Sequence, residues 1–386
     1  MTEWRVTLSE PDLGPEESQA VAAVLRSRWL TMGAVTQTFE AKFAEFCSAR
    51  YAIAVANGTA ALHLAHWALG IGSGDEVICP ALTFVATANS VLYCRATPVF
   101  ADISGLDNLN ISPEAIRQKI SPRTRCITVM HYGGYPCDMQ AIRKIAGEHG
   151  LAVIEDACHT IGAEYHGKKC GTLGDIGCFS FFSNKNMVTG EGGMLVTDNA
   201  ELAQKLRLGR SHGMTTMSWD RHQGHASGYD VVDLGFNYRI DEMRSALGQV
   251  QLGKLEANNR RRGELTRRYQ NHLRQLSSLS LPFINHAASS SKALSGAFHL
   301  FPILLPPACD RSRFMEEMKR RGIQTSVHYP PVHRFHYYQK HFQQAAGTLP
   351  LTEEVSRREV TLPLHPLMKP EDVDFVCQTI SEIISA

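Results

Sequence analysis

Three residues in the middle of the chain have side chains that could act together on one ligand. Asp156 follows an apolar segment with the pattern of a strand, and His159 lies one helical turn further on. Lys185 follows a second such segment, Cys178–Phe182, and precedes the Gly-rich turn Gly190–Gly193. Open α/β sheets bind ligands at the carboxyl ends of their strands. A carboxylate there can keep a ring nitrogen protonated, and a lysine there can form a Schiff base.

A candidate phosphate-binding turn lies earlier, where Asn57–Ala61 follows a strand pattern and opens a helix. The first backbone N–H groups of a helix have no partner within it and lie at the positive end of its dipole. The Gly-rich signatures of ATP and dinucleotide binding are both missing from the sequence. Taken singly, each feature has an ordinary explanation: a surface lysine, an aspartate that caps a helix, and a turn into a helix.

Seven short runs together resemble the DegT/DnrJ/EryC1/StrS family of nucleotide-sugar aminotransferases, which use pyridoxal 5′-phosphate (PLP) and adopt fold type I of the aspartate aminotransferase superfamily. The runs occur in the family's order over nearly the whole chain. They are Asn57–Ala61, Pro80–Phe84, Pro98–Asp102, Glu155–His159, Gly174–Lys185, Gly190–Gly193 and Gly235–Arg239. Any one of them is a weak signal, and their combination is specific.

The resemblance implies roles around the cofactor ring. Lys185 would hold PLP as a Schiff base and move protons between cofactor and substrate carbons. Asp156 would pair with the pyridinium nitrogen and strengthen the electron sink. His159 would contact the ring hydroxyl, and Phe84 would stack on the pyridine face unless it only packs in the core.

The resemblance also implies how the phosphate is held. Thr59, Ala60 and Ser180 would bind it within one subunit. Asn237 would reach the phosphate of the neighbouring subunit, so a homodimer with shared active sites is expected.

The implied reaction is a two-stage amino transfer. L-glutamate would convert the cofactor to pyridoxamine 5′-phosphate and leave as 2-oxoglutarate, and a nucleotide-linked keto-sugar would then take the nitrogen. Relatives that act as sugar dehydratases carry His at this position, so the presence of Lys185 disfavours a dehydratase activity. Two other functions stay open: amination of a free keto-cyclitol, and a regulatory protein that keeps the fold without turnover.

Two segments favour amination at C4 of a nucleotide-linked 4-keto-6-deoxyhexose over amination at C3. Phe182–Gly193 and the loop Trp29–Gly33 are closer to relatives that aminate C4, although Met32 replaces a second threonine in that loop. Methionine cannot donate the hydrogen bond of a hydroxyl. Thr31 of this loop and His328 are the candidate substrate-binding residues.

The arrangement of apolar segments predicts an α/β fold. Between about residues 50 and 200, strand patterns alternate with helix patterns, which predicts a mostly parallel, buried sheet. We expect a large PLP-binding domain over residues 1–250, whose segment 1–30 partly lines the active site, and a smaller α+β domain over residues 251–386. A long helix after Asp241 should present its basic stretch Asn259–Arg262 to solvent, and residues 286–296 should form a loop.

Composition excludes several other classes of protein. The 386 residues carry a formal net charge of +1, without the basic excess of a nucleic-acid binder. No apolar run approaches the roughly 18 residues of a membrane span, and the N-terminus does not resemble a signal peptide. Ten cysteines without a C-x-x-C pair favour reduced thiols and a cytoplasmic location. Histidines such as His63 and His66 lack a matched ligand set, so no metal site is expected.

Overall fold

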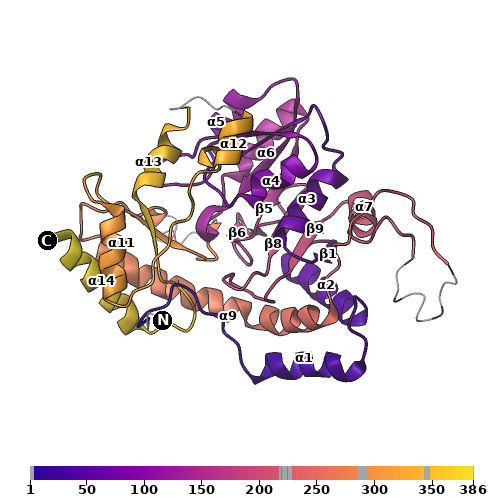
Figure 1. Ribbon diagram of the computed structural model, residues 1–386, viewed down its shortest axis with the longest axis horizontal. Helices are drawn as coiled ribbons and strands as arrows, with labels where there is room; N and C mark the ends of the chain where they lie inside the picture. The colour runs from indigo at the N-terminus through magenta and orange to yellow at the C-terminus, as the bar shows by residue number, and fades with distance from the viewer. Residues whose placement is uncertain are drawn as a thin grey trace.

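The computed structural model of the chain describes residues 4–285, apart from 217, 218, 220–223 and 225–227, together with residues 294–342 and 348–385. Figure 1 shows a central sheet with helices on both faces and the long helix α9 (Glu242–Leu273) running below it toward a smaller unit that holds the C-terminus. Most of the loop expected at 286–296 lies outside the described residues. Within those residues, no helix has both the length and the apolar character needed to cross a membrane.

Seven strands form the central sheet in the order β1-β9-β8-β5-β4-β2-β3. All of them run parallel except β9, which is antiparallel to both of its neighbours. The strands are β1 (Tyr51–Val55), β2 (Glu76–Pro80), β3 (Thr97–Ala101), β4 (Thr124–Met130), β5 (Ala152–Asp156), β8 (Ile176–Ser180) and β9 (Gly193–Thr197). The predicted mostly parallel sheet is therefore confirmed.

Both faces of the sheet are buried by helices, because successive strand residues point to opposite sides. In β1, Ile53 and Val55 pack into the core beneath α3, whereas Ala52 and Ala54 pack with Phe39 and Phe43 of α2. The helices of the large unit are α1 (Pro15–Ser27), α2 (Ala34–Cys47), α3 (Gly58–Ala68), α4 (Ala86–Tyr93), α5 (Pro113–Lys119), α6 (Met139–His149) and α7 (Ala200–Arg210).

Strand β8 begins and ends two residues before the predicted segment Cys178–Phe182. Its pairing sets these bounds, because Ile176 pairs with Ile154 of β5 and Ser180 pairs with Gly193 of β9. A Cβ atom on Gly177 would lie 2.1 Å from the carbonyl oxygen of Gly171, so only glycine fits at this point of the strand. Ser180 consequently becomes the last residue of the strand, next to the Gly-rich turn that leads to β9.

The smaller unit has its own core, built on the antiparallel pair β11 (Phe301–Leu304) and β12 (Glu359–Leu362). Its helices are α11 (Arg311–Arg320), α12 (His336–Phe342), α13 (Pro350–Arg358) and α14 (Pro370–Ser385). Leu265 and Tyr269 of α9 and Val6 of the N-terminal segment also belong to this core. Residue 250, where we predicted the domain boundary, lies inside α9. A small sheet, β6 (Glu164–Tyr165), β7 (Lys168–Lys169) and β10 (Leu294–Ser295), lies outside the central one.

The basic stretch of α9 is not uniformly solvated. Arg260 is exposed, but Arg262 is buried and donates a hydrogen bond to the carbonyl of Leu364 at 2.7 Å. The expectation that this stretch faces solvent is therefore wrong for Arg262, which links α9 to the smaller unit. A buried guanidinium is tolerated there because a backbone carbonyl accepts its hydrogen.

Glu242, the first residue of α9, fixes the loop before α2. Its carboxylate accepts hydrogen bonds from the backbone N–H groups of Gly33, Val35 and Thr36, each at 2.8 Å, and from the Thr36 hydroxyl at 2.6 Å. The N–H of Glu242 donates to the carbonyl of Leu30 at 3.0 Å. Because a carboxylate here satisfies the unpaired donors of a helix N-terminus, it stabilises both the helix and the loop.

We expect Glu242→Ala to lower the free energy of unfolding by about 3 kcal/mol, since several charge-assisted hydrogen bonds are lost and their buried donors stay unpaired. Urea denaturation followed by circular dichroism would measure the loss. Glu256→Ala removes an exposed carboxylate from the same helix and should change stability by less than about 0.5 kcal/mol. Equal effects of the two substitutions would contradict this account.

Candidate active site

Asp156 is the last residue of β5 and is held by hydrogen bonds at both carboxylate oxygens. Its Oδ2 accepts from the Thr87 hydroxyl at 2.7 Å, and its Oδ1 accepts from the N–H of Cys158 at 3.2 Å. The Thr87 hydroxyl proton is thereby used, so Thr83 donates to Thr87 across their 2.8 Å contact. These threonines were not identified from the sequence. They fix the direction of a carboxylate that is only 4% exposed.

His159 lies beside Asp156 with its ring packed between two other aromatic side chains. Its Nε2 forms a 2.9 Å hydrogen bond with the hydroxyl of Tyr329, and its ring centroid lies 4.4 Å from that of His299. Burial, together with the charge of Lys185, lowers the pKa of His159 well below its ordinary value, so the ring is neutral. Its Nδ1 is buried and has no partner among the described residues.

Hydrogen bonds of the Asn186 amide fix the ring of His299. The Asn186 amide nitrogen donates to the carbonyl of Ala297 at 2.6 Å and to Oδ1 of Asn259 at 2.7 Å. Its Oδ1 must therefore accept from Nδ1 of His299, at 2.9 Å. This network orients the ring of His299, which packs against His159, and it anchors the residue directly after Lys185.

Lys185 is partly buried in the turn that follows β8. Its backbone N–H donates to the carbonyl of Phe182 at 2.9 Å, which sets the turn. Burial lowers the pKa of the Lys185 amine, against the opposing effects of Cys158 and Asp156. A lowered pKa increases the fraction of neutral amine, which is the nucleophilic form.

The first turn of α3 packs directly against the end of β8. A Cβ atom on Gly58 would lie 2.8 Å from Cβ of Ser180, so glycine is what allows the helix N-terminus and this serine to meet. Asn57 caps the helix, and its Oδ1 accepts the N–H of Ala60 at 2.8 Å. The helix N-terminus near Ser180 also presents the N–H groups of Gly58 and Thr59. Together they form a cradle of donors suited to a phosphate.

Phe84 and His328 complete the cluster. Phe84 is 55% exposed, and its ring centroid lies 6.0 Å from that of Tyr329, so an aromatic face is open to a ligand. His328 is buried, and its Nδ1 contacts the Thr361 hydroxyl at 2.9 Å. Burial and the nearby Lys185 lower the pKa of His328 to about 4. The adjacent Tyr329 connects this segment to the large unit through its hydrogen bond with His159.

Two residues expected at the site do not join the cluster within one chain. Thr31 lies exposed in the loop before α2, and Asn237 lies exposed beside Ser211, with which it forms a backbone bridge. Across the ranges that the structure describes, no contact connects either side chain to Lys185 or Asp156.

The cluster fits a phosphorylated pyridine cofactor. Asp156 can hold a protonated ring nitrogen, and the unpartnered Nδ1 of His159 can bond to a polar ring substituent. The exposed face of Phe84 and the cradle at Ser180 suit the ring and the phosphate, and Lys185 supplies the amine. These features define a PLP-dependent enzyme. Within the described ranges, no group of three or more His, Cys, Asp or Glu side chains could hold a metal ion, and His63 and His66 pack within the fold.

The chain belongs to the DegT/DnrJ/EryC1/StrS aminotransferase family, whose model matches residues 11–381. It is 40% identical over 381 residues to the spore coat polysaccharide biosynthesis protein SpsC of Bacillus subtilis, covering 97% of this chain and 96% of that protein. Helicobacter pylori PseC, an aminotransferase involved in pseudoaminic acid biosynthesis, superimposes with a TM-score of 0.90 at 31% identity over 99% of both chains. DesV of S. venezuelae, solved with a ketimine intermediate, gives a TM-score of 0.88 at 32% identity over 98% and 100% of the two chains.

The protein is therefore a PLP-dependent sugar aminotransferase of this family. The family and its structural neighbours imply a nucleotide-sugar substrate and an amino donor.

Gly58→Ala should weaken cofactor binding without unfolding the protein. The added methyl group would displace the first turn of α3 from Ser180, which separates the two parts of the cradle. The visible absorbance that stays with the protein after dialysis, and titration of the apoprotein with PLP, would measure the effect; we expect at least a tenfold loss of affinity, about 1.4 kcal/mol. Gly253→Ala is the matched control, because a Cβ there meets nothing within 4 Å. Equal retention by both variants would contradict the cradle.

Proposed function

We propose that this enzyme transfers an amino group from L-glutamate to C4 of a nucleotide-linked 4-keto-6-deoxyhexose. The observation that carries the aminotransferase site is the convergence of a fixed carboxylate, Asp156, a neutral histidine, His159, and a partly buried lysine, Lys185, at one edge of the sheet. The choice of C4 is supported by the segments Phe182–Gly193 and Trp29–Gly33. C3 amination and a keto-cyclitol acceptor are the alternatives.

Each residue of the cluster then has a task. When bound, PLP supplies an electron-withdrawing ring that stabilises negative charge at the substrate carbon. Asp156 would keep the ring nitrogen protonated, and its two hydrogen bonds hold the carboxylate in place. Lys185 would anchor the cofactor, and its amine, when free and neutral, would carry protons between the substrate carbon and the cofactor. His159 would donate to the ring hydroxyl, and Phe84 would cover one face of the ring.

Phosphate binding is assigned to the cradle between α3 and β8. Thr59 supplies a hydroxyl and a backbone N–H, and Ser180 supplies a hydroxyl that already accepts the Phe182 N–H at 3.3 Å and so has its own proton to donate. Ala60 takes part through the same turn. Its N–H already donates to Oδ1 of Asn57, so a phosphate that accepted this N–H would compete with the helix cap.

The residues proposed to bind substrate come from two sides. His328 lies behind Tyr329 in the smaller unit, where Thr361 contacts its ring and the carboxyl group of Glu359 accepts its backbone N–H. Thr31 lies in the loop that Glu242 anchors. Positional choice depends on which carbonyl the pocket holds at the reacting centre, and a small misplacement is costly. A loop tied to α9 gives the positional stability that such a choice requires.

A homodimer with shared sites accounts for the surface around Asn237. The segment before this residue carries a set of exposed apolar side chains: Tyr229, Val231, Val232 and Leu234, of which Leu234 is 79% exposed. Large apolar side chains gathered on a surface mark an interaction site. The exposed amide of Asn237 and the exposed hydroxyl of Thr31 are then available to the site of a second copy of the chain.

Incubation with L-glutamate and a nucleotide-linked 4-keto-6-deoxyglucose should give a product aminated at C4, assigned by NMR. Lys185→Ala should lose both the turnover and the visible absorbance of the bound cofactor, because it removes the anchor and the proton carrier. Amination at C3, or reaction only with a 3-keto isomer, would contradict C4 and leave the aminotransferase assignment intact. A turning-over Lys185→Ala variant would contradict the site itself.

Mixing experiments test the shared site. Lys185→Ala and Asn237→Ala homodimers should each be weak, but subunits unfolded and refolded together should regain about a quarter of wild-type activity, since half of the dimers then hold one intact site. Analytical ultracentrifugation should show a dimer at working concentrations. An active monomer, or no recovery in refolded dimers of mixed composition, would contradict the proposal.

A further inference from the structure

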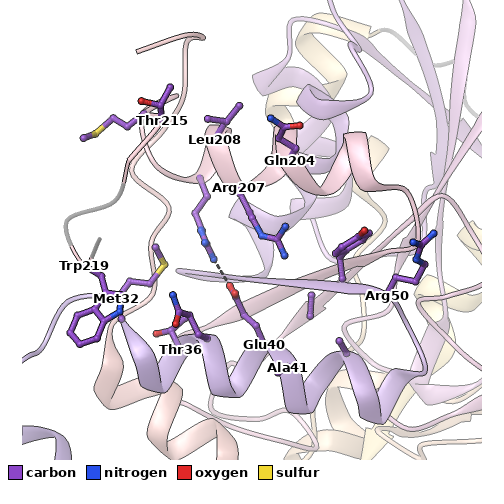
Figure 2. A pocket seen from close by; sticks show the side chains of 17 residues that line it. Met32, Thr36, Glu40, Ala41, Arg50, Gln204, Arg207, Leu208, Thr215 and Trp219 are labelled. Atoms are coloured by element: carbon purple, nitrogen blue, oxygen red, sulfur yellow. Dashed lines mark hydrogen bonds and ion pairs between the residues drawn. The ribbon is translucent and has the colours of Figure 1, made fainter. Parts of the chain in front are cut away.

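A large groove lies along β1, the edge strand of the central sheet. Figure 2 shows a groove with α2 along one side and α7 along the other, with β1 between them. Its volume is about 840 Å³, within the range of about 300–1,000 Å³ typical of small-molecule sites. The groove runs from Met32 and Trp219 at one end to Arg50 at the other.

The far end of the groove is cationic. The guanidinium groups of Arg50 and Arg207 lie 5.7 Å and 5.5 Å from the ring centroid of Tyr51. Cation–π contact holds both groups in place and leaves their N–H donors available. Neither guanidinium forms an ion pair within the described ranges; the carboxylate of Asp198 accepts only the backbone N–H of Arg50. Two preorganised forks with available donors suit an anion with several oxygens.

A third arginine is part of the wall but is already neutralised. Arg210 forms a buried ion pair with Glu40, and the same two side chains bond to the carbonyl and the N–H of Ala54. This pair covers the free edge of β1 at Ala54, so another strand cannot pair there. Arg210 therefore contributes no free positive charge to the groove, which leaves Arg50 and Arg207 as the cationic residues of its far end.

The opposite end is apolar and aromatic. Met32 and Met214 line it, and Trp219 packs edge-on against Trp29 with a centroid distance of 5.0 Å. From Thr36 to Ala44, the wall formed by α2 spans about 12 Å at 1.5 Å per residue. An aromatic platform at this distance from a pair of arginines matches a ligand that has a flat base at one end and phosphates at the other.

We propose that this groove binds the diphosphate group of a nucleotide, with the phosphates between Arg50 and Arg207 and the base toward Trp219. It is separate from the catalytic cradle of the same chain, because Tyr51 begins β1 whereas Asn57 and Gly58 follow its end, roughly 15–20 Å away along the strand. The Arg210–Glu40 pair and the Ala56–Tyr238 backbone bond lie between them. The site does not depend on which sugar carbon is aminated.

The groove also touches the segment that carries Asn237. Backbone bonds join Gly209 to Phe236 and Arg210 to Tyr238, and Ser211 bridges Asn237. A ligand held by Arg207 would therefore stabilise the strand-like pairing that positions Asn237. The groove therefore adjoins the segment that, under the proposed function, contacts a second copy of the chain.

Isothermal titration of the PLP-loaded enzyme with UDP, UMP and inorganic pyrophosphate tests the site. We expect saturable UDP binding that Arg50→Gln combined with Arg207→Gln weakens by at least about tenfold, because two charge-assisted contacts are lost. Lys205→Gln is the matched control: it removes one positive charge from α7 at a residue that does not line the groove. The double variant should keep the visible absorbance of the cofactor and the aminotransferase turnover, which shows that it is folded.

The three ligands distinguish the sources of the anion. Binding of both UDP and pyrophosphate supports recognition of the diphosphate alone, and binding of UDP only supports the additional contact with the base. Unchanged UDP binding in the double variant would place the nucleotide in the catalytic site alone and overturn the proposal. Equal weakening by Lys205→Gln, which would mean nonspecific charge attraction, or no saturable binding, would overturn it as well.

Discussion

The register between β5 and β8 is the constraint on which the active site depends. These adjacent parallel strands pair Asp156 with Cys178, so Asp156 and Ser180 both lie at the carboxyl edge of the sheet. Glu155 holds the turn that leads into β8. Its carboxylate is 0% exposed and accepts the N–H groups of Gly171, Leu173 and Gly174 at 2.6–2.8 Å. One buried acid therefore fixes this turn, and its neighbour along the chain, Asp156, is the residue proposed to pair with the cofactor ring.

The smaller unit contacts this edge through the segment that carries His328 and Tyr329. His328 and Tyr329 lie against the large unit, where Tyr329 bonds to His159, and the hydroxyl of Tyr132 donates to the carbonyl of His328. The long helix α9 adds a further connection through the buried Arg262. Because the contacts that orient His159 come from both units, movement between them would disturb the ring before it disturbed Asp156.

Sequence motifs could locate the ends of strands, but not which side chains from distant parts of the chain lie beside them. Asp156, Lys185 and the turn at Asn57 were found because each follows an apolar run, and parallel strands bring such ends together. His299 was missed because its partner Asn186 is 113 residues away along the chain and no local pattern marks it. The burial of Arg262 and the earlier start of β8 also depend on tertiary contacts, namely a distant carbonyl and the pairing with β5 and β9.

The electrostatic consequence is a site with few charges despite its many titratable groups. His159, His299 and His328 all have lowered pKa values, chiefly through burial, so these imidazoles are neutral. Burial also raises the pKa of Glu359 to about 8, so its carboxyl group is largely protonated at neutral pH. Asp156 and Lys185 therefore lie among neutral imidazoles rather than cationic ones. Because charges interact more strongly in a medium of low effective dielectric, such neutral surroundings favour the proposed pairing of Asp156 with a protonated ring nitrogen.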